Sequence, residues 1–552
     1  MRPDPRDTPD TRRTGPTGTT RVPEHCDVLV VGAGFAGIYA VIRARAAGFA
    51  VRGIDAADDV GGTWYWNRYP GARCDVESVD YSYSFDPQLQ REWRWSERFA
   101  TQPEIKAYLD HVADRYDVRR HFRFGERVVA ASFDETTAHW TVSTDHGAPV
   151  VARHLVLATG SLSAPNRPDI PGIDSFAGQT LMTAAWPVEG VDLAGKRVGV
   201  IGTGSSGIQS IPILAEAASR LTVFQRSANY TVPASNRPFS DEDHAEIQRS
   251  YADRRAKSWA SAAGSPHESD PRSMWDYDEE ERTRAFETRW REGGVLFSKT
   301  FPQQLVDPAV NDVARRFAED KIRAIVRDPR VASDLIPTDH PIGTKRICTD
   351  SGYYETFNRD HVELVNLRRN PITEITSWGV KTRDASYELD VLVLATGFDA
   401  MTGAITRIDL TGARGARIAD AWSEGPVTYL GLMVPDFPNL FVLNGPGSPS
   451  VLANMVLTSE QQVNWVVDLL THCEERAHTL VEPRRDVARA WTRHVDEAAH
   501  RTLFPQADSW YLGANIEGKP RVFMPYIGGF KTYLDLCEEA RDSGYAGFIL
   551  GS

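Results

Sequence analysis

One short glycine pattern occurs twice in this chain, and it restricts the fold more than any other feature. The first copy occupies residues 32–37 and the second occupies residues 202–207, with glycines at the first, third and sixth positions. An apolar run precedes each copy, Val28–Val31 or Val198–Ile201, and an apolar-periodic helix follows it. Glycines at this spacing allow a tight turn, a close approach of backbone to a pyrophosphate, and close packing of helix on strand. The repeat therefore predicts an α/β fold with two Rossmann-like dinucleotide-binding domains.

The residue that follows the second strand of each unit indicates which dinucleotide binds there. In the first unit Asp55 stands where a carboxylate can accept hydrogen bonds from a pair of ribose hydroxyls. In the second unit the corresponding residues are Gln225 and Arg226. A guanidinium binds a 2′-phosphate through paired charge-assisted hydrogen bonds, whereas a carboxylate would repel it. We therefore expect FAD in the first unit and NADP in the second.

Two further apolar strands run into a glycine turn, Leu155–Gly160 and Val391–Asp399, and we expect them to return the chain between the domains. The domains would then be interleaved in sequence, with a charged, helical insert in the second and a polar, disordered tail in front of the first. The expected division is 1–24 for the tail, 25–160 and 386–552 for the FAD-binding domain, 161–234 and 336–385 for the NADP-binding domain, and 235–335 for the insert.

Charge and cysteine content exclude several other classes of protein. The net charge of −13 argues against nucleic acid and against an anionic membrane as a partner. The five cysteines are far apart, so they form neither a redox pair nor a zinc-binding spacing, which excludes a disulfide reductase and predicts no metal site. No apolar run is long enough to span a membrane, and no export signal is recognised. A cytoplasmic protein is expected, as a monomer, with a dimer as the alternative.

Several segments outside the glycine units resemble the FAD- and NADPH-dependent Baeyer–Villiger monooxygenases. They are "GGTWYWNRYPGARCDVES", "VIGTGSSGIQ", "GTKRI", "LATGFDAMTG", "GPGSPSVLANM" and "SWYLGAN", and the resemblance covers nearly the whole chain after the tail. Three more segments, "GGVLFSKTFP", "DSGYYETFNRD" and "SPSVLANMVL", are most similar to members that oxidise steroid or aryl ketones. The resemblance implies conversion of a bulky ketone to an ester or lactone with NADPH and O2, through a peroxide on flavin C4a.

The resemblance also assigns roles to single residues. Arg346 matches the catalytic arginine, whose fixed positive charge suits a peroxyanion and a negative adduct. Asp75 matches the carboxylate that holds this arginine beside the flavin, and Trp510 matches a tryptophan near nicotinamide and substrate. The expected cofactor-binding residues are Gly32, Gly34, Gly37, Asp55, Thr63, Trp64, Trp66, Asp75, Tyr81, Thr203, Gly204, Ser205, Ser206, Gly207, Arg226, Lys345, Arg346 and Trp510. The expected substrate-contacting residues are Ser450, Val451, Leu452 and Trp510.

One position departs from the pattern of the family. The fingerprint Phe-x-Gly-x-x-x-His-x-x-x-Trp-Pro is matched by Phe176, Gly178 and Trp186, but Met182 stands in place of the histidine. The resemblance implies that this histidine acts at a hinge between the domains. Methionine offers only a weak acceptor, so a buried partner left unpaired would cost about 1–3 kcal/mol. Two outcomes are open: a repacked linker with catalysis intact, or an enzyme that wastes NADPH as an oxidase.

Two other functions remain as alternatives at this stage. A flavin monooxygenase that oxygenates nitrogen or sulfur would use the same cofactors. A regulator that binds NADPH without catalysis would need only the nucleotide-binding units, and the additional segments that match the family argue against it.

Overall fold

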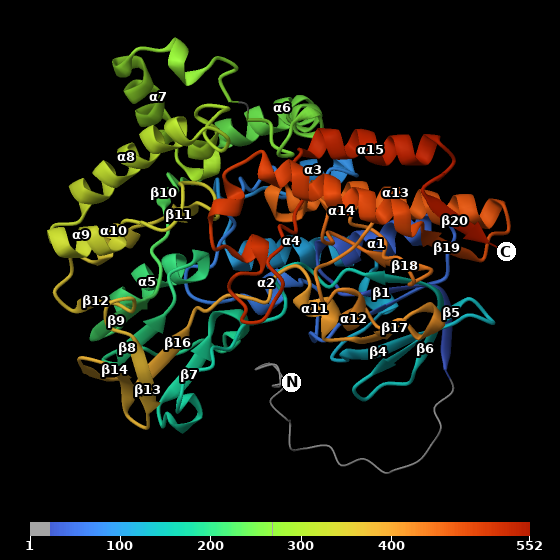
Figure 1. Cartoon of the computed structure of the whole chain (residues 1–552), viewed down its shortest axis with the longest axis horizontal. Coiled ribbons are helices and arrows are strands. Elements are labelled where there is room, and N and C mark those ends of the chain that lie inside the picture. Colours follow the sequence, from blue (N-terminus) through green and yellow to red (C-terminus); the bar gives the residue numbers. More distant parts are fainter. Residues whose placement is uncertain (1–22, 268, 552) are drawn as a thin grey trace.

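The computed structural model describes residues 23–267 and 269–551. Residues 1–22 of the expected tail lie outside the described residues, and the first strand already begins at Glu24. Two large sheets dominate the architecture, one on each side of the molecule (Figure 1). Each sheet contains the strand of one glycine unit. The predicted α/β fold with two Rossmann-like, interleaved dinucleotide-binding domains is therefore confirmed.

The first sheet has eight strands in the order β17-β4-β5-β6-β1-β2-β3, with β18 paired to β6. Its strands come from both ends of the chain: β1 (Glu24–Val31), β2 (Val51–Ile54), β3 (Phe122–Arg123), β4 (Val128–Asp134), β5 (His139–Thr144), β6 (Val150–Leu157), β17 (Asp409–Thr411) and β18 (Leu440–Val442). Val28 and Val30 pack into one apolar cluster, while Leu29 and Val31 pack into another on the opposite face. Successive side chains of a strand point to opposite faces, so the buried half of this strand, Val28–Val31, is apolar throughout.

Helices α1 (Phe35–Ala46) and α13 (Met455–Glu475) share the first of these clusters and pack against each other. Helices α14 (Arg485–His500) and α15 (Phe530–Asp542) contribute to the same cluster, above the sheet in Figure 1. The C-terminal quarter of the chain therefore covers the sheet that the N-terminal residues begin.

The second sheet has five strands, all parallel, in the order β12-β9-β8-β16-β7. They are β7 (Gln179–Met182), β8 (Arg197–Ile201), β9 (Arg220–Gln225), β12 (Val362–Asn366) and β16 (Val391–Leu394). The helix that follows the second glycine turn is α5 (Ser205–Ala217). A purely parallel sheet needs a crossover connection for every pair of neighbours, and α5 supplies the one between β8 and β9.

The boundary expected at residue 386 misplaced β16. That division put the strand in the FAD-binding domain, but β16 pairs with β7 and β8 in the second sheet. The reason is a symmetry between the two halves. In the first sheet β6 lies beside the glycine-unit strand β1, and in the second sheet β16 lies beside β8 in the same way. Each unit therefore needs its own Ala-Thr-Gly strand.

The glycine turns explain why an Ala-Thr-Gly strand end can pack directly against each of them. A Cβ on Gly32 would lie 2.4 Å from the carbonyl oxygen of Ala158, and a Cβ on Gly202 would lie 2.4 Å from that of Ala395. Both glycines have positive φ, 109° and 110°, which L side chains rarely adopt. The first position of each motif therefore requires glycine for two reasons: its positive φ, and the close contact with the strand end that packs on it.

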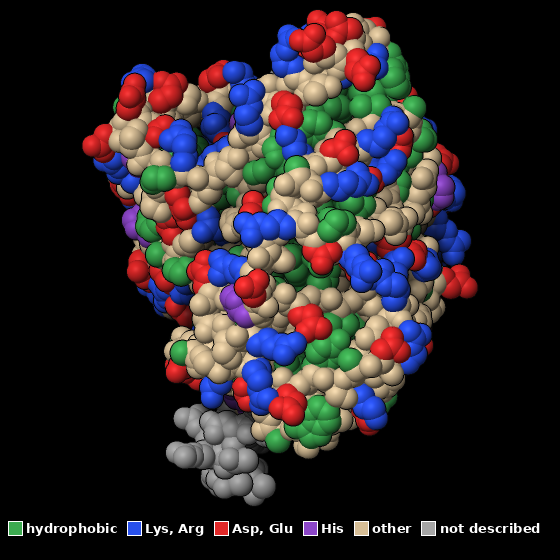
Figure 2. Space-filling view, turned by 90° about the vertical axis from the view of Figure 1, so that its left-hand side faces the viewer, with side chains coloured by type: hydrophobic (Ala, Val, Ile, Leu, Met, Phe, Trp, Pro, Cys, Tyr) green, Lys and Arg blue, Asp and Glu red, His purple; other side chains and the backbone are tan. Residues whose placement is uncertain are grey.

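The expected helical insert contains four helices, at the upper left of Figure 1: α6 (Asp241–Ala260), α7 (Glu279–Glu292), α8 (Pro308–Ile325) and α9 (Pro329–Leu335). A capping box on Ser240 starts α6, and one on Asp278 starts α7. Acidic and basic side chains are intermixed over the face that Figure 2 shows, without a single-sign field. The charged runs of the insert therefore act as solvated helix faces.

The remaining elements are mostly short, except α4 (Gln102–Arg115), whose Ile105 and Leu109 are fully buried in the first apolar cluster. They are α2 (Thr63–Trp66), α3 (Pro87–Glu92), α4, α10 (Tyr353–Thr356), α11 (Gly403–Thr406), α12 (Ile418–Ala421), β10 (Thr231–Pro233), β11 (Cys348–Asp350), β13 (Ile372–Thr376), β14 (Gly379–Thr382), β15 (Ser386–Glu388), β19 (Leu480–Pro483) and β20 (Phe548–Gly551). Within the described part of the chain, no helix has the length and apolar character that crossing a membrane requires.

Candidate functional site

A cavity of about 1260 Å³ reaches from the first glycine turn to the second. Gly34 and Gly204, the middle glycines of the two motifs, both line it. A Cβ on Gly204 would meet no protein atom within 4 Å, and one on Gly34 would meet only the backbone of Gly62 at 3.4 Å. A side chain at either position would therefore fill the cavity instead of striking the protein. These two glycines keep space for a ligand, as a pyrophosphate requires.

The helix that begins at each turn offers free backbone donors to that ligand. Neither α1 nor α5 has a side-chain cap or an acidic residue in its first turn. The first N–H groups of a helix have no partner within the helix, and with the helix dipole they favour an anion. The third glycines, Gly37 and Gly207, lie behind the turns, where a Cβ would collide with the carbonyl oxygens of Gly32 and Gly202. Both cradles thus fit a dinucleotide.

Asp55 has a structural task in addition to the expected one. Its carboxylate accepts hydrogen bonds from the backbone N–H groups of Ala33, at 2.5 Å, and Ala57, at 2.7 Å. These bonds fix the glycine turn to the end of β2. The residue also lines the cavity, and a carboxylate has further lone pairs that can accept from ribose hydroxyls.

The other residues expected to contact FAD lie together on the cavity wall. Thr63, Trp64 and Trp66 come from α2, and Tyr81 comes from the loop beyond it. The indole Nε1 of Trp64 donates to the hydroxyl of Tyr81 at 3.2 Å. Thr203, Ser205 and Ser206 line the same cavity at the second turn.

The basic residues expected at a 2′-phosphate also meet at one edge of the second sheet. Arg226 and Lys345 both line the cavity, and no described carboxylate forms an ion pair with Arg226. Burial lowers the pKa of Lys345, and the charge of Asp339, 3.7 Å away, partly offsets this effect. Arg368 pairs with the same Asp339 and donates to the carbonyl oxygen of Arg226 at 3.0 Å.

Arg368 and Asp339 were missed by the sequence interpretation. Arg368 lies just beyond β12, which neighbours β9 in the parallel sheet, and the carboxyl ends of parallel strands meet at one edge. The position of Arg368 just beyond a strand of this edge is the signal by which the sequence could have identified it. Nothing local marks Asp339, which lies in an irregular segment after α9.

Arg346 and Asp75 form a two-pronged ion pair in the cavity wall. Nε of Arg346 donates to Asp75 Oδ2 and its Nη2 donates to Oδ1, both at 2.8 Å. The remaining prong, Nη1, donates to the carbonyl oxygen of Val451 at 3.0 Å. Burial opposes the charge of Arg346, but the Asp75 carboxylate more than compensates and raises its pKa above the usual range. The guanidinium therefore stays charged and is fixed in orientation.

The residues expected to contact substrate separate into three groups. Trp510 and Val451 line the large cavity, and the Trp510 ring packs against Tyr511 with centroids 4.2 Å apart. Leu452 lines a smaller adjoining pocket. Ser450 lines neither of these two spaces: it is fully buried and its hydroxyl is hydrogen-bonded to that of Ser161 at 3.1 Å. The expected contact of Ser450 with substrate stays a prediction.

The fingerprint residues lie away from this cavity. Met182, at the end of β7, is 7% exposed and packs in an apolar cluster that includes Ile201, Phe224 and Leu394. Gly178 is needed because a Cβ there would lie 2.5 Å from the carbonyl oxygen of Asp390. Phe176 borders the same cluster, and Trp186 is buried in the neighbouring one.

Replacing Arg226 should weaken the preference for NADPH over NADH. An Arg226→Ala enzyme is expected to lose about ten- to a hundred-fold of that preference in kcat/KM, because each charge-assisted hydrogen bond contributes about 1.5–3 kcal/mol. Arg220→Ala is the matched control, since Arg220 starts the same strand β9 but pairs with Glu363. An unchanged preference would assign the phosphate to Lys345 and Arg368 alone.

Restoring the histidine of the fingerprint should destabilise this protein. Met182→Ile and Met182→Leu keep the cluster apolar, whereas Met182→His buries an imidazole without a partner and should lower stability by about 1–3 kcal/mol. The measurement is the melting temperature followed by flavin fluorescence, with Met182→Leu as the control. A higher melting temperature for Met182→His would show that a partner for the histidine exists after all.

Comparisons with known proteins agree with this geometry. Residues 26–250 match the family model described as pyridine nucleotide-disulphide oxidoreductase, which covers both glycine motifs. That match reflects nucleotide binding, since all five cysteines are unpaired in the structure. The chain is 44% identical to a Baeyer–Villiger monooxygenase of Pseudooceanicola batsensis, over 95% of this chain and 96% of that protein. It is 42% identical to a phenazine N-monooxygenase of Lysobacter antibioticus, over 96% and 97%.

A solved structure of oxidised steroid monooxygenase bound to NADP superposes with a TM-score of 0.92 at 55% identity, over 96% of this chain and 99% of that one. Identity at these levels over almost the entire length establishes the family. The chain belongs to the Baeyer–Villiger monooxygenases, enzymes that depend on FAD and NADPH.

Proposed function

We propose that this enzyme inserts an oxygen atom from O2 beside the carbonyl of a bulky ketone, steroid-like or aryl, and so forms an ester or lactone. The observation that carries the proposal is the fixed guanidinium of Arg346 in the wall of a cavity that reaches both nucleotide cradles.

When bound and reduced by NADPH, FAD supplies the oxygen-transfer chemistry. The residues of this chain supply position and charge. As a nucleophilic oxygen adds to a carbonyl, negative charge develops on the carbonyl oxygen, and a preorganised cation stabilises it. Arg346 provides that charge without a proton to lose, because Asp75 raises its pKa further. The bond to the carbonyl of Val451 ties the guanidinium to the loop that borders the substrate.

Asp75 acts through Arg346 and is therefore a positioning residue. A free arginine side chain samples many rotamers, and each must be frozen before the guanidinium can stabilise a developing charge. The two hydrogen bonds from Asp75 hold it in one orientation in advance. Trp510 is proposed to close the wall beside the nicotinamide and the substrate.

The proposed substrate class, a steroid-like or aryl ketone, is based on similarity to a relative. The steroid monooxygenase has the highest identity, 55%, among the relatives described above, and the pocket loop includes the apolar Val451 and Leu452. A large cavity with an apolar wall is suited to a bulky ketone. The other domain boundaries, the cytoplasmic location and the monomeric state expected from the sequence stay predictions.

Oxygenation of nitrogen is the second candidate, because one relative is named a phenazine N-monooxygenase. Transfer of oxygen to nitrogen or sulfur places no negative charge on a substrate oxygen, so it has no comparable need for Arg346. Met182 has apolar neighbours, and the oxidase alternative stays a third candidate that the amount of hydrogen peroxide formed per NADPH decides.

The test of the proposal is the product made from a ketone and a thioether supplied together. An Arg346→Ala enzyme should lose ester formation by about a hundred- to a thousand-fold, because a preorganised donor to the developing charge is removed. Oxidation of NADPH should continue and yield hydrogen peroxide. Ester, sulfoxide, peroxide and NADPH are measured in the same reaction.

Arg407→Ala is the matched control, because Arg407 lines the same cavity but donates to the carbonyl oxygen of Pro165. It should retain ester formation. If the unmodified enzyme produced sulfoxide but no ester from any ketone offered, oxygenation of nitrogen or sulfur would replace the proposal.

A further inference from the structure

A second pocket, of about 310 Å³, adjoins the large cavity at the catalytic arginine. Asp75, Arg346 and Ala453 line both spaces. Its middle is apolar, with Leu305, Ile347, Leu452 and Phe504 among its walls. A ketone held at Arg346 can therefore extend its apolar body into this pocket.

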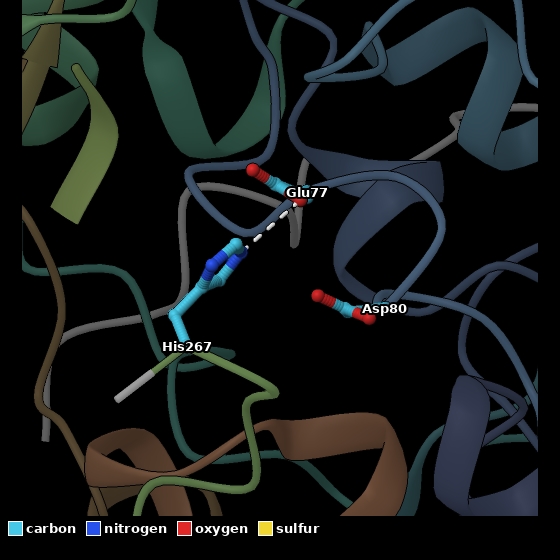
Figure 3. Close-up of side chains that lie close together, drawn as sticks. All are labelled: Glu77, Asp80 and His267. Atoms are coloured by element: carbon cyan, nitrogen blue, oxygen red, sulfur yellow. Dashed lines mark ion pairs between the residues drawn. The ribbon is translucent and has the colours of Figure 1, made fainter. Parts of the chain in front are cut away.

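The end of the pocket is polar, and its two acids are already paired. Arg254 donates to both carboxylate oxygens of Asp80, at 2.6 and 2.7 Å, and it also pairs with Glu77. Arg98 donates to the other oxygen of Glu77 at 2.9 Å. His267 points toward Glu77, with its Nε2 3.3 Å from the carboxylate (Figure 3).

Glu77, Asp80 and His267 lie close enough to suggest a metal site, but their partners argue against one. Two guanidinium groups occupy the carboxylate oxygens that a cation would need. A divalent ion would have to displace both arginines and would be repelled by them. The cluster is therefore a set of ion pairs that forms a rigid wall.

Lys299, at the end of a 3₁₀ turn (Gly294–Lys299), also lines this pocket and is not part of those pairs. Its Nζ donates to the carbonyl oxygen of His267 at 3.1 Å, and no described carboxylate lies within ion-pair distance. The cations Arg98, Arg254 and Lys299 outnumber the anions Glu77 and Asp80 by three to two. An ammonium has three donors, so two of them remain for a ligand.

We propose that the second pocket binds the far end of the ketone substrate, and that Lys299 there donates a hydrogen bond to an oxygen of that substrate, in a carboxylate or a second carbonyl. This inference rests on the proposed function and narrows its substrate class to keto acids and diketones. A site built to donate to a substrate oxygen rejects the analogue that lacks it, because the buried donor is then left unpaired.

The test uses three linear methyl ketones of equal chain length that differ only at the far end: a methyl group, a second carbonyl, or a carboxylate. Binding is measured by calorimetry to the oxidised, FAD-containing enzyme saturated with NADP⁺, in which no turnover occurs. The keto acid and the diketone should each bind about ten-fold or more tightly than the simple ketone. Lys299→Met should bring all three affinities within about two-fold of one another.

Lys257→Met is the control, because Lys257 lies on the exposed face of α6 and pairs with Asp253. It should preserve the ranking of the three ligands. FAD content verifies that Lys299→Met is folded, and Lys299→Arg, which keeps the charge, should keep the preference for the keto acid. Equal affinities in the unmodified enzyme, or a preference that survives in Lys299→Met, would overturn the inference.

The pH dependence of keto-acid binding gives an independent readout. Burial lowers the pKa of Lys299 to about 8, an effect that Asp80 opposes and Arg289 reinforces. The other charged groups at this end are Glu77, Arg98 and Arg254, together with His267. The ammonium is charged below this pKa, so affinity for the keto acid should fall as pH rises through about 8. The simple ketone should show no such fall, and neither should the keto acid with Lys299→Met.

Failure here can be distinguished from failure of the proposed function. If the simple ketone yields ester in the unmodified enzyme while Lys299→Met leaves the ranking intact, only the role of Lys299 is wrong. If neither these three nor a steroid or aryl ketone yields ester and a thioether is oxidised, the proposed function is wrong as well.

Discussion

The ion pair between Arg346 and Asp75 is the interaction on which the rest of the site depends. It joins residues 271 positions apart, and its third prong reaches the carbonyl of Val451, a further 105 positions along the chain. Asp75 lies between strands of the first sheet, Arg346 precedes the last strands of the second, and Val451 belongs to the C-terminal part. One guanidinium therefore has its position set by three separate parts of the fold. Such a group is preorganised only when the whole chain has folded.

Interleaving of the chain is what brings these parts together. The segments that cross between the two sheets, residues 161–166 and 396–401, are hydrogen-bonded to each other. Asn166 donates its backbone N–H to Gly397 at 2.9 Å, and Met401 donates to Ser161 at 2.8 Å. Both crossings leave directly from an Ala-Thr-Gly strand end that packs on a glycine turn. A nucleotide bound at either turn thus contacts the start of the connection to the other unit.

Sequence reasoning succeeded where the physical cause is local. The glycine turns, the helices after them and the strand ends at Asp55 and Arg226 all follow from spacing within about 30 residues. It failed where the cause is distant. The partner of β16 depends on a symmetry between sheets. Arg346 and Asp75 could be paired beforehand only through the resemblance, because no local pattern relates two residues so far apart.

The crossing segments also limit how Met182 can matter. The two units are joined by two hydrogen-bonded crossing segments, so relative motion of the units is a hinge motion about these segments. The hinge residues are those whose backbone angles change during the motion. Met182 lies instead at the end of β7, paired in register with Leu394, two residues before the second crossing begins. Its apolar side chain belongs to one cluster with Ile201 and Leu394, so an effect on a hinge would pass through the packing of β16. Packing of apolar side chains therefore links the end of β7 to the strand from which the second crossing starts, and the part of this position in domain movement stays a prediction.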